Sequence, residues 1–101
     1  MSENLQNLPK TYQEDIKKAI EILKKNGAKE VFVFGSIVNG KMNENSDIDI
    51  AVKGLKPEEF YRVASILNFE LENEIDLVDL DDKTNRFAQM ILELGGLLKV
   101  G

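Results

Sequence analysis

Residues 31–52 read VFVFGSIVNGKMNENSDIDIAV, and they contain two apolar runs separated by a polar stretch. The first run, residues 31–34, is continuous and rich in β-branched and aromatic residues, as is typical of a buried strand. The second run, residues 48–53, predicts another strand for the same reason. The polar link between the runs is short and lacks a full helix, so we expect the two strands to pair antiparallel.

Two acids at the start of the second strand lie on one face of it, because residues two apart in a strand point the same way. Asp47 and Asp49 are therefore neighbouring carboxylates, which repel each other unless a hard cation lies between them. Antiparallel pairing brings Gly35 and Ser36, at the end of the first strand, beside them. Their backbone N–H groups and hydroxyl can bind phosphate oxygens. Carboxylates for Mg²⁺ beside a phosphate-binding loop are the groups that phosphoryl or nucleotidyl transfer needs.

The spacing of apolar residues predicts a helix ahead of the first strand. Thr11 and Glu14 have the spacing of a capping box, which would begin this helix. Asn26-Gly27 would end it. Apolar residues recur at i, i+3, i+4 and i+7, and these are Ile16, Ala19, Ile20 and Leu23.

The second half of the chain predicts two more helices around a third strand. Pro57 suits the first turn of a helix, and apolar residues then recur at helical spacing. Residues 75–80 (IDLVDL) predict the third strand. A last helix is predicted to end at Gly95-Gly96. Its apolar residues are Phe87, Met90, Ile91 and Leu94. Residues 97–100 are a short apolar tail, which either closes the core or contacts a partner.

A full helix joins the second and third strands, so we expect these strands to be parallel. The start of the third strand then lies at the same sheet edge as Asp47 and Asp49. The acid found there is Asp76. Three carboxylates and the Gly-Ser loop thus converge from three separate stretches of sequence.

Three other acids compete with Asp76 for this role. Strand parity places Asp79 on the opposite face of the sheet. Asp81 and Asp82 lie past the third strand, at the far end of the sheet, where we expect their charges to cap the last helix. The run DLDDKTN lacks the glycine of an EF-hand loop, which argues against calcium binding there.

The order α-β-β-α-β-α predicts an α/β (α+β) fold with a small mixed three-stranded sheet packed by helices. With 101 residues in all, we expect residues 1–101 to form a single domain. The content of 43% hydrophobic and 31% charged residues is typical of a soluble globular protein. No apolar run approaches the roughly 18–20 residues of a membrane span. The polar N-terminus lacks the core of a signal peptide, so we expect a cytoplasmic protein with no membrane association.

Composition excludes several kinds of site. The chain has no Cys and no His, which excludes disulfides, structural zinc, Cys nucleophiles and His-dependent triads. Any metal must be bound by oxygen ligands, which points to Mg²⁺, Mn²⁺ or Ca²⁺. A net charge of −5 and a pI of about 4.7 argue against direct nucleic-acid binding, which would need a basic stripe.

A P-loop is the competing interpretation of residues 35–42, GSIVNGKM, which nearly match G-x-x-x-x-G-K-[ST] after an apolar strand. Met42 stands where a hydroxyl should bind Mg²⁺. Residues 43–47 predict a loop, whereas a P-loop is followed at once by a long helix. We therefore favour the carboxylate site, and Lys41 is a candidate phosphate ligand in either scheme.

The runs VFVFGS, SDIDIAV and EIDLVDL together resemble the minimal nucleotidyltransferases (MNT) of the DNA polymerase beta-like superfamily, over essentially the whole chain. The Gly-Ser-x10-Asp-x-Asp spacing is similar in particular to the antitoxins of HEPN/MNT toxin–antitoxin pairs. This resemblance implies an enzyme that uses one or two Mg²⁺ ions to move AMP from ATP to a hydroxyl. It implies a HEPN-domain protein as partner, with a tyrosine of that toxin as the acceptor.

The resemblance also implies roles for particular residues. The implied catalytic and metal-binding residues are Asp47, Asp49 and Asp76, and the implied nucleotide-binding residues are Gly35, Ser36 and Lys41. Of the acids, Asp76 would activate the attacking hydroxyl.

Two alternatives stay open. Family members often carry basic residues directly after Gly-Ser, whereas this chain has Ile37 and Val38. That departure supports a degenerate antitoxin, which neutralises its HEPN ribonuclease by binding alone. The other alternative is nucleotidylation of a small molecule such as an aminoglycoside, although relatives with that activity need extra domains to enclose the substrate. A homo-oligomer is compatible with each of these interpretations.

Overall fold

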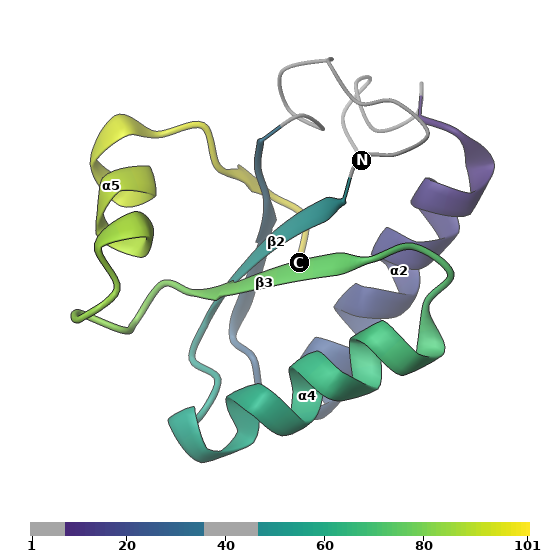
Figure 1. Cartoon of the computed structure of the whole chain (residues 1–101), viewed down its shortest axis with the longest axis horizontal. Coiled ribbons are helices and arrows are strands. Elements are labelled where there is room, and N and C mark those ends of the chain that lie inside the picture. The colour runs from purple at the N-terminus through teal and green to yellow at the C-terminus, as the bar shows by residue number, and fades with distance from the viewer. Residues whose placement is uncertain (1–7, 36–46) are drawn as a thin grey trace.

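The computed structural model describes residues 8–35 and 47–101. In chain order the elements are α2 (Lys10–Lys25), β1 (Glu30–Val33), β2 (Ile48–Lys53), α4 (Pro57–Glu70), β3 (Ile75–Asp79), α5 (Arg86–Leu94) and β4 (Leu98–Lys99) (Figure 1). Over these ranges the predicted order of helices and strands is confirmed, with β4 added at the end. No helix in the described part of the chain is both long and apolar enough to span a membrane.

The four strands form one sheet in the order β3-β2-β1-β4. β1 and β2 are antiparallel, with Val33 opposite Ile50. β2 and β3 are parallel, with Ile48 opposite Ile75. Both directions agree with the predictions, because α4 carries the chain back to the end of the sheet where β2 began.

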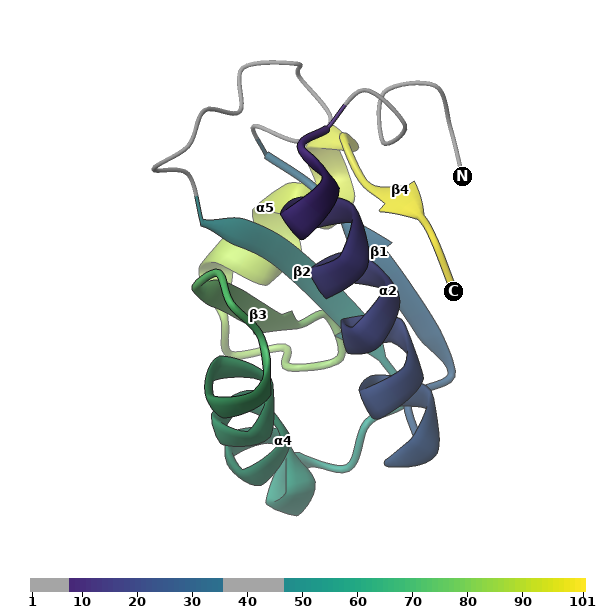
Figure 2. The same ribbon diagram turned by 90° about the vertical axis from the view of Figure 1, so that its right-hand side faces the viewer.

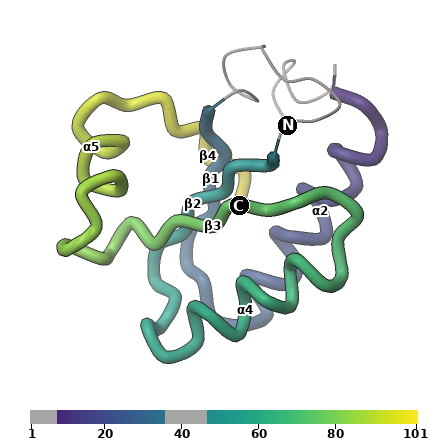
Figure 3. Tube along the Cα trace, in the orientation of Figure 1, coloured from purple at the N-terminus to yellow at the C-terminus, as the bar shows by residue number. Residues whose placement is uncertain are grey.

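The C-terminal tail adds a strand, so the sheet has four strands rather than the three predicted. Leu98 of β4 lies opposite Val33 in an antiparallel pair. Val100 N donates to Val31 O at 2.8 Å, and Val31 N donates to Gly101 O at 2.9 Å. The tail therefore covers the free edge of β1, and Figure 3 shows it ending beside the sheet. Leu98 and Val100 pack against the core, which favours core closure over partner contact for these residues.

The sheet separates two helical layers, with α2 and α4 on one face and α5 on the other (Figure 2). The larger apolar cluster fills the space under α2 and α4. Its largest fully buried side chains are Ile16, Leu23, Val31, Val33, Ile48, Ile50, Val52, Val63 and Leu67. The smaller cluster under α5 consists of Phe34, Ala51, Val78, Leu80, Ala88 and Ile91. Burying each large aliphatic side chain contributes about 1.5–3 kcal/mol, so these two clusters hold the layers together.

The start of α2 departs from the prediction. The helix begins at Lys10, no side chain caps it, and the capping box of Thr11 and Glu14 is wrong. Pro9 occupies the cap position with φ −52° and ψ 146°. A proline fixes φ and needs no hydrogen bond to its own nitrogen, so it can precede the first turn directly. Thr11 is consequently the second residue of the helix and not its cap.

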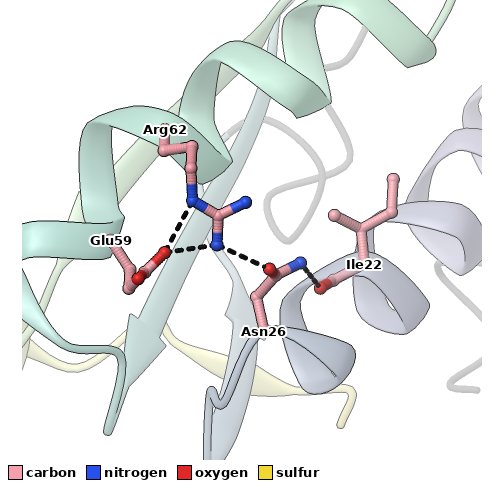
Figure 4. Close-up of polar contacts among 4 residues, drawn as sticks. All are labelled: Ile22, Asn26, Glu59 and Arg62. Carbon is pink, nitrogen blue, oxygen red and sulfur yellow. Dashed lines mark hydrogen bonds and ion pairs between the residues drawn. The ribbon is translucent and has the colours of Figure 1, made fainter.

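The end of α2 is tied to α4 by polar contacts (Figure 4). As predicted, the helix ends at Asn26-Gly27, and Gly27 has the positive φ of 106° that glycine adopts without strain. Asn26 Nδ2 donates to Ile22 O at 2.7 Å, and Asn26 Oδ1 accepts from Arg62 Nη2 at 2.8 Å. Arg62 Nε also donates to Glu59 Oε2 at 2.6 Å. The Asn26–Arg62 hydrogen bond joins the two helices at the end of the sheet where β2 finishes, and the other two contacts hold its partners in place.

The cap of α5 is Asn85, so the predicted capping by Asp81 and Asp82 is wrong. Asn85 Oδ1 accepts from the second and third backbone N–H groups of the helix at 3.0 and 3.2 Å. Asp82 Oδ1 instead accepts from the backbone N–H of Thr84 at 3.0 Å. Asp81 Oδ2 accepts from the backbone N–H of Gly54 at 2.6 Å. A turn thus separates both acids from the helix, and the residue directly before the helix provides the cap.

Candidate functional site

Asp49 and Asp76 lie opposite each other on neighbouring parallel strands, and we call them the carboxylate pair. The next pair on the same face is Ala51 with Val78, and both of these are buried under α5. The carboxylate pair lies two residues nearer the start of each strand, outside the apolar cluster under α5. Asp49 is half-buried there and Asp76 is exposed. The structure therefore brings together two acids that are far apart in sequence, at the sheet edge expected from the connections.

The electrostatics of this strand end disfavour the ionised form of Asp49. The pKa of Asp49 is raised from 3.8 to about 6. Burial away from water is the main cause, and the negative charges of Asp76 and Asp47 raise the pKa further. Both effects favour the neutral form of the acid. A bound cation would supply the opposite charge that keeps Asp49 ionised.

Gly35 lies against the Asp49 carboxylate. The backbone N–H of Phe34 donates to Asp49 O at 3.1 Å, which holds the end of the first strand beside the second. Gly35 has φ +72°, and a β-carbon at this position would overlap Asp49 Oδ2 and come within 3.3 Å of Asp49 Cγ. The positive φ therefore favours glycine, and a β-carbon here would have to displace the Asp49 carboxylate.

The other predicted site residues are less fully described. Asp47 is exposed and lies directly before β2. Ser36 and Lys41, the other predicted nucleotide ligands, fall outside the described residues. In the part of the chain that the structure describes, no group of three or more His, Cys, Asp or Glu side chains is arranged to hold a metal ion. What the structure assembles is the carboxylate pair and the glycine beside it.

The chemistry of this donor set fits a hard divalent cation. The donors at this strand end are carboxylate oxygens, and the chain contains no Cys or His that would favour zinc or copper. The two carboxylates face each other, and the pKa of Asp49 is raised. A divalent cation between them would offset the repulsion of their negative charges.

A separate cavity of about 720 Å³ lies at the other end of β2 and β3. Asp79 lines it from the opposite face of the sheet, as parity predicted, together with Leu77 and Tyr61. Burial raises the pKa of Asp79. A hydrogen bond from the backbone of Asp81 lowers it, and the charges of Asp81 and Asp82 raise it again. The cavity shares no lining residue with the carboxylate pair, so it is distinct from the candidate site.

Sequence reasoning missed two polar residues that hold the segment leading into β3. Asp15 of α2 accepts hydrogen bonds from Glu72 and Asn73. Asn68 of α4 accepts one from the backbone N–H of Ile75 at 3.0 Å. The signal for Asp15 was an acid on the buried stripe of a helix, since charged residues are seldom fully buried unless they have a partner.

Comparison with solved structures finds similar chains in toxin–antitoxin complexes. A chain in the structure of a toxin–antitoxin with AMP-PNP is 30% identical with a TM-score of 0.65, and the match covers 82% of this chain and 69% of that one. A chain in the structure of the toxin–antitoxin MntA–HepT is 27% identical with a TM-score of 0.61, and the match covers 86% of this chain and 69% of that one. A chain in the structure of the tri-AMPylated Shewanella oneidensis HEPN toxin in complex with MNT antitoxin is 31% identical with a TM-score of 0.52. This match covers 69% of this chain and 56% of that one. A search of the curated proteins gave no match.

The sequence of residues 17–100 matches the family described as Polymerase beta, Nucleotidyltransferase. The matched range includes all four strands, the carboxylate pair and the glycine beside it. The mixed sheet with its two helical layers is the nucleotidyltransferase core that the resemblance implied. This chain therefore belongs to the polymerase beta nucleotidyltransferase family and is similar to the MNT antitoxins of HEPN toxin–antitoxin pairs.

Proposed function

We propose that this protein is a Mg²⁺-dependent nucleotidyltransferase that moves AMP from ATP to a hydroxyl, and that the acceptor is a tyrosine of a HEPN toxin partner. The observation that carries the proposal is the carboxylate pair, Asp49 opposite Asp76, in a chain of the nucleotidyltransferase family. Two relatives support the choice of nucleotide and acceptor. One is a toxin–antitoxin with AMP-PNP, and the other contains a tri-AMPylated HEPN toxin.

Asp47, Asp49 and Asp76 would hold the metal, as one or two ions. When bound, Mg²⁺ supplies positive charge that neutralises the phosphate oxygens and the departing pyrophosphate. The raised pKa of Asp49 is consistent with this role, because burial and the charges of Asp76 and Asp47 disfavour its ionised form, and a bound cation would offset both effects.

The proposed reaction is a displacement at the α-phosphorus of ATP. The acceptor oxygen forms a bond to this phosphorus, the bond from phosphorus to the oxygen bridging the α- and β-phosphates breaks, and pyrophosphate leaves. The carboxylate of Asp76 accepts the proton of the attacking hydroxyl. Asp76 suits this role better than Asp49, because Asp76 is exposed to an incoming acceptor whereas Asp49 lies half-buried against Gly35.

Gly35, Ser36 and Lys41 would bind the triphosphate. Gly35 is the part of this set that the structure describes, and its positive φ turns the chain directly beside Asp49. A residue without a side chain lets phosphate oxygens approach the backbone N–H groups of the turn. Ser36 would add a hydroxyl donor and Lys41 a positive charge.

A degenerate antitoxin that neutralises its HEPN ribonuclease by binding alone is the second candidate. Two observations favour it. Ile37 and Val38 replace the basic residues that often follow Gly-Ser, and no three acids in the described ranges are arranged around a metal position. The two candidates differ in the effect of Asp47→Asn. The enzyme would lose its ability to neutralise the toxin in growing cells, whereas a binding-only antitoxin would keep it.

Label transfer tests the proposed enzyme. The full chain is incubated with α-labelled ATP, Mg²⁺ and lysate from its own source, in parallel with Asp49→Asn and Asp79→Asn. Asp79 is a matched control, since burial also raises its pKa but it lies on the opposite face of the sheet. We expect a labelled protein with the wild type and with Asp79→Asn, and none with Asp49→Asn. Full labelling by Asp49→Asn would overturn the proposal, and no labelling by any form, with a partner still co-purifying, would favour binding alone.

A further inference from the structure

Asp15 is a buried carboxylate that the proposed reaction does not use. It lies on α2 and is only 2% exposed. Its Oδ2 accepts from the backbone N–H of Asn73 and from Asn73 Nδ2, both at 2.8 Å, and its Oδ1 accepts from the backbone N–H of Glu72 at 3.3 Å. Burying a charge is costly unless it is hydrogen-bonded, so these three donors explain how the carboxylate is accommodated there.

The donors belong to the short segment between α4 and β3. Asn68 of α4 holds the end of this segment, because its Oδ1 accepts from the backbone N–H of Ile75 at 3.0 Å. Glu74 O accepts from the backbone N–H of Ile48 at 2.9 Å, which joins the segment to the start of β2. The next residue after Ile75 is Asp76. The segment held by Asp15 and Asn68 thus leads straight into the carboxylate pair.

We propose that Asp15 is a positioning residue for the metal site, holding the α4–β3 segment so that Asp76 stays opposite Asp49. This inference rests on the proposed function, because it assigns Asp15 a part in the same site. A shift of one residue between β2 and β3 would turn Asp76 to the other face of the sheet. Fixing the backbone just before the strand prevents such a shift.

The chemistry of the contact explains why the residue is an aspartate. The segment presents three N–H donors, and both carboxylate oxygens accept from them. An asparagine of the same size would turn an NH₂ group toward at least one of these donors. The Asp15→Asn variant should therefore loosen the segment while leaving the volume of the buried side chain nearly unchanged.

The test compares Asp15→Asn with Asn26→Ala in the full chain. Asn26 is a matched control, because it joins the same two helices, α2 and α4, through Arg62 at their other end. Mn²⁺ binding is measured by calorimetry, and amide hydrogen exchange is measured at Ile48 in the metal-free protein. We expect Asp15→Asn to weaken Mn²⁺ binding about tenfold, as is typical when a residue supporting a metal ligand is lost. We also expect faster exchange at Ile48, with Asn26→Ala close to the wild type in both measurements.

Each result decides a different claim. Wild-type Mn²⁺ affinity and unchanged exchange at Ile48 in a folded Asp15→Asn protein would overturn the inference. No Mn²⁺ binding by the wild type would instead contradict the proposed function, and the exchange at Ile48 would still decide whether Asp15 fixes the segment. If Asp15→Asn fails to fold, Asn73→Ala removes the side-chain donor alone and should weaken Mn²⁺ binding by a smaller factor. No change in either measurement for Asn73→Ala would then overturn the inference.

Discussion

Replacing Asp49 by asparagine should stabilise the metal-free protein while abolishing the proposed nucleotidyl transfer. The pKa of this acid is raised from 3.8 to about 6, chiefly because it is partly buried and secondarily because Asp76 and Asp47 are negative. A shift of about two pKa units corresponds to at most roughly 3 kcal/mol at neutral pH. The side chain is partly exposed, so screening by solvent reduces the expected effect to about 1–1.5 kcal/mol.

The sign of the pH dependence follows from the direction of the shift. The folded protein holds the Asp49 proton more tightly than the unfolded chain does, so ionisation favours unfolding. The destabilisation is absent below the unfolded pKa of 3.8, grows as the pH rises, and is complete above the folded pKa of about 6. The gain from Asp49→Asn should therefore be largest at neutral pH and shrink toward acid pH.

Urea unfolding in the presence of a chelator measures this difference at neutral pH and near pH 4.5. Adding Mg²⁺ should then raise the stability of the wild type, by about 1.4 kcal/mol at ten times the dissociation constant, and leave Asp49→Asn unchanged. The reasoning would be refuted if the variant were less stable than the wild type at neutral pH without metal, or if Mg²⁺ stabilised both proteins equally.

Three further predictions concern the same fold. Gly35→Ala should lower stability by about 1–2 kcal/mol, because of its positive φ, and should abolish Mn²⁺ binding by displacing the Asp49 carboxylate; calorimetry that gave wild-type affinity would contradict this. Asn85→Ala should lower the free energy of unfolding by about 1 kcal/mol by removing the α5 cap, whereas Thr11→Ala, which removes no cap, should change it by less than about 0.5 kcal/mol. Equal losses in the two variants would argue against this assignment of caps. Leu67→Ala, at a fully buried position, should cost about 2–5 kcal/mol in urea unfolding, and a loss below about 1 kcal/mol would show that the core under α4 is loosely packed.

The topology of the sheet could be predicted from the sequence because each connection allows few arrangements. The link between β1 and β2 is polar and was predicted to lack a full helix, whereas the link between β2 and β3 contains one, so the two strand directions follow from the connections. The meeting of Asp49 and Asp76 is a consequence of these directions. The alternation of side chains along β3 likewise placed Asp79 away from the pair, since Asp76 and Asp79 are three residues apart and so point to opposite faces of the sheet.

The features that the sequence did not reveal depend on tertiary contacts. The strand β4 is two residues long, and it exists because the edge of β1 is free to accept it. The bonds of Asp15 join positions 57 and 58 residues apart, which no local pattern specifies. Thr11 fits a capping motif by its spacing from Glu14, but Pro9 occupies the cap position and the helix already begins at Lys10. In each case a contact or a neighbouring residue overrode the local pattern.

The measurement that most directly tests the central claim compares α-labelled with γ-labelled ATP in the presence of the co-purified partner. If the carboxylate pair supports transfer of AMP, the partner will acquire label from α-labelled ATP only, on tyrosine, and only when Mg²⁺ is present and both Asp49 and Asp76 are intact. Label from γ-labelled ATP would show phosphoryl transfer instead. Undiminished labelling by Asp49→Asn or Asp76→Asn would contradict the assignment of this site.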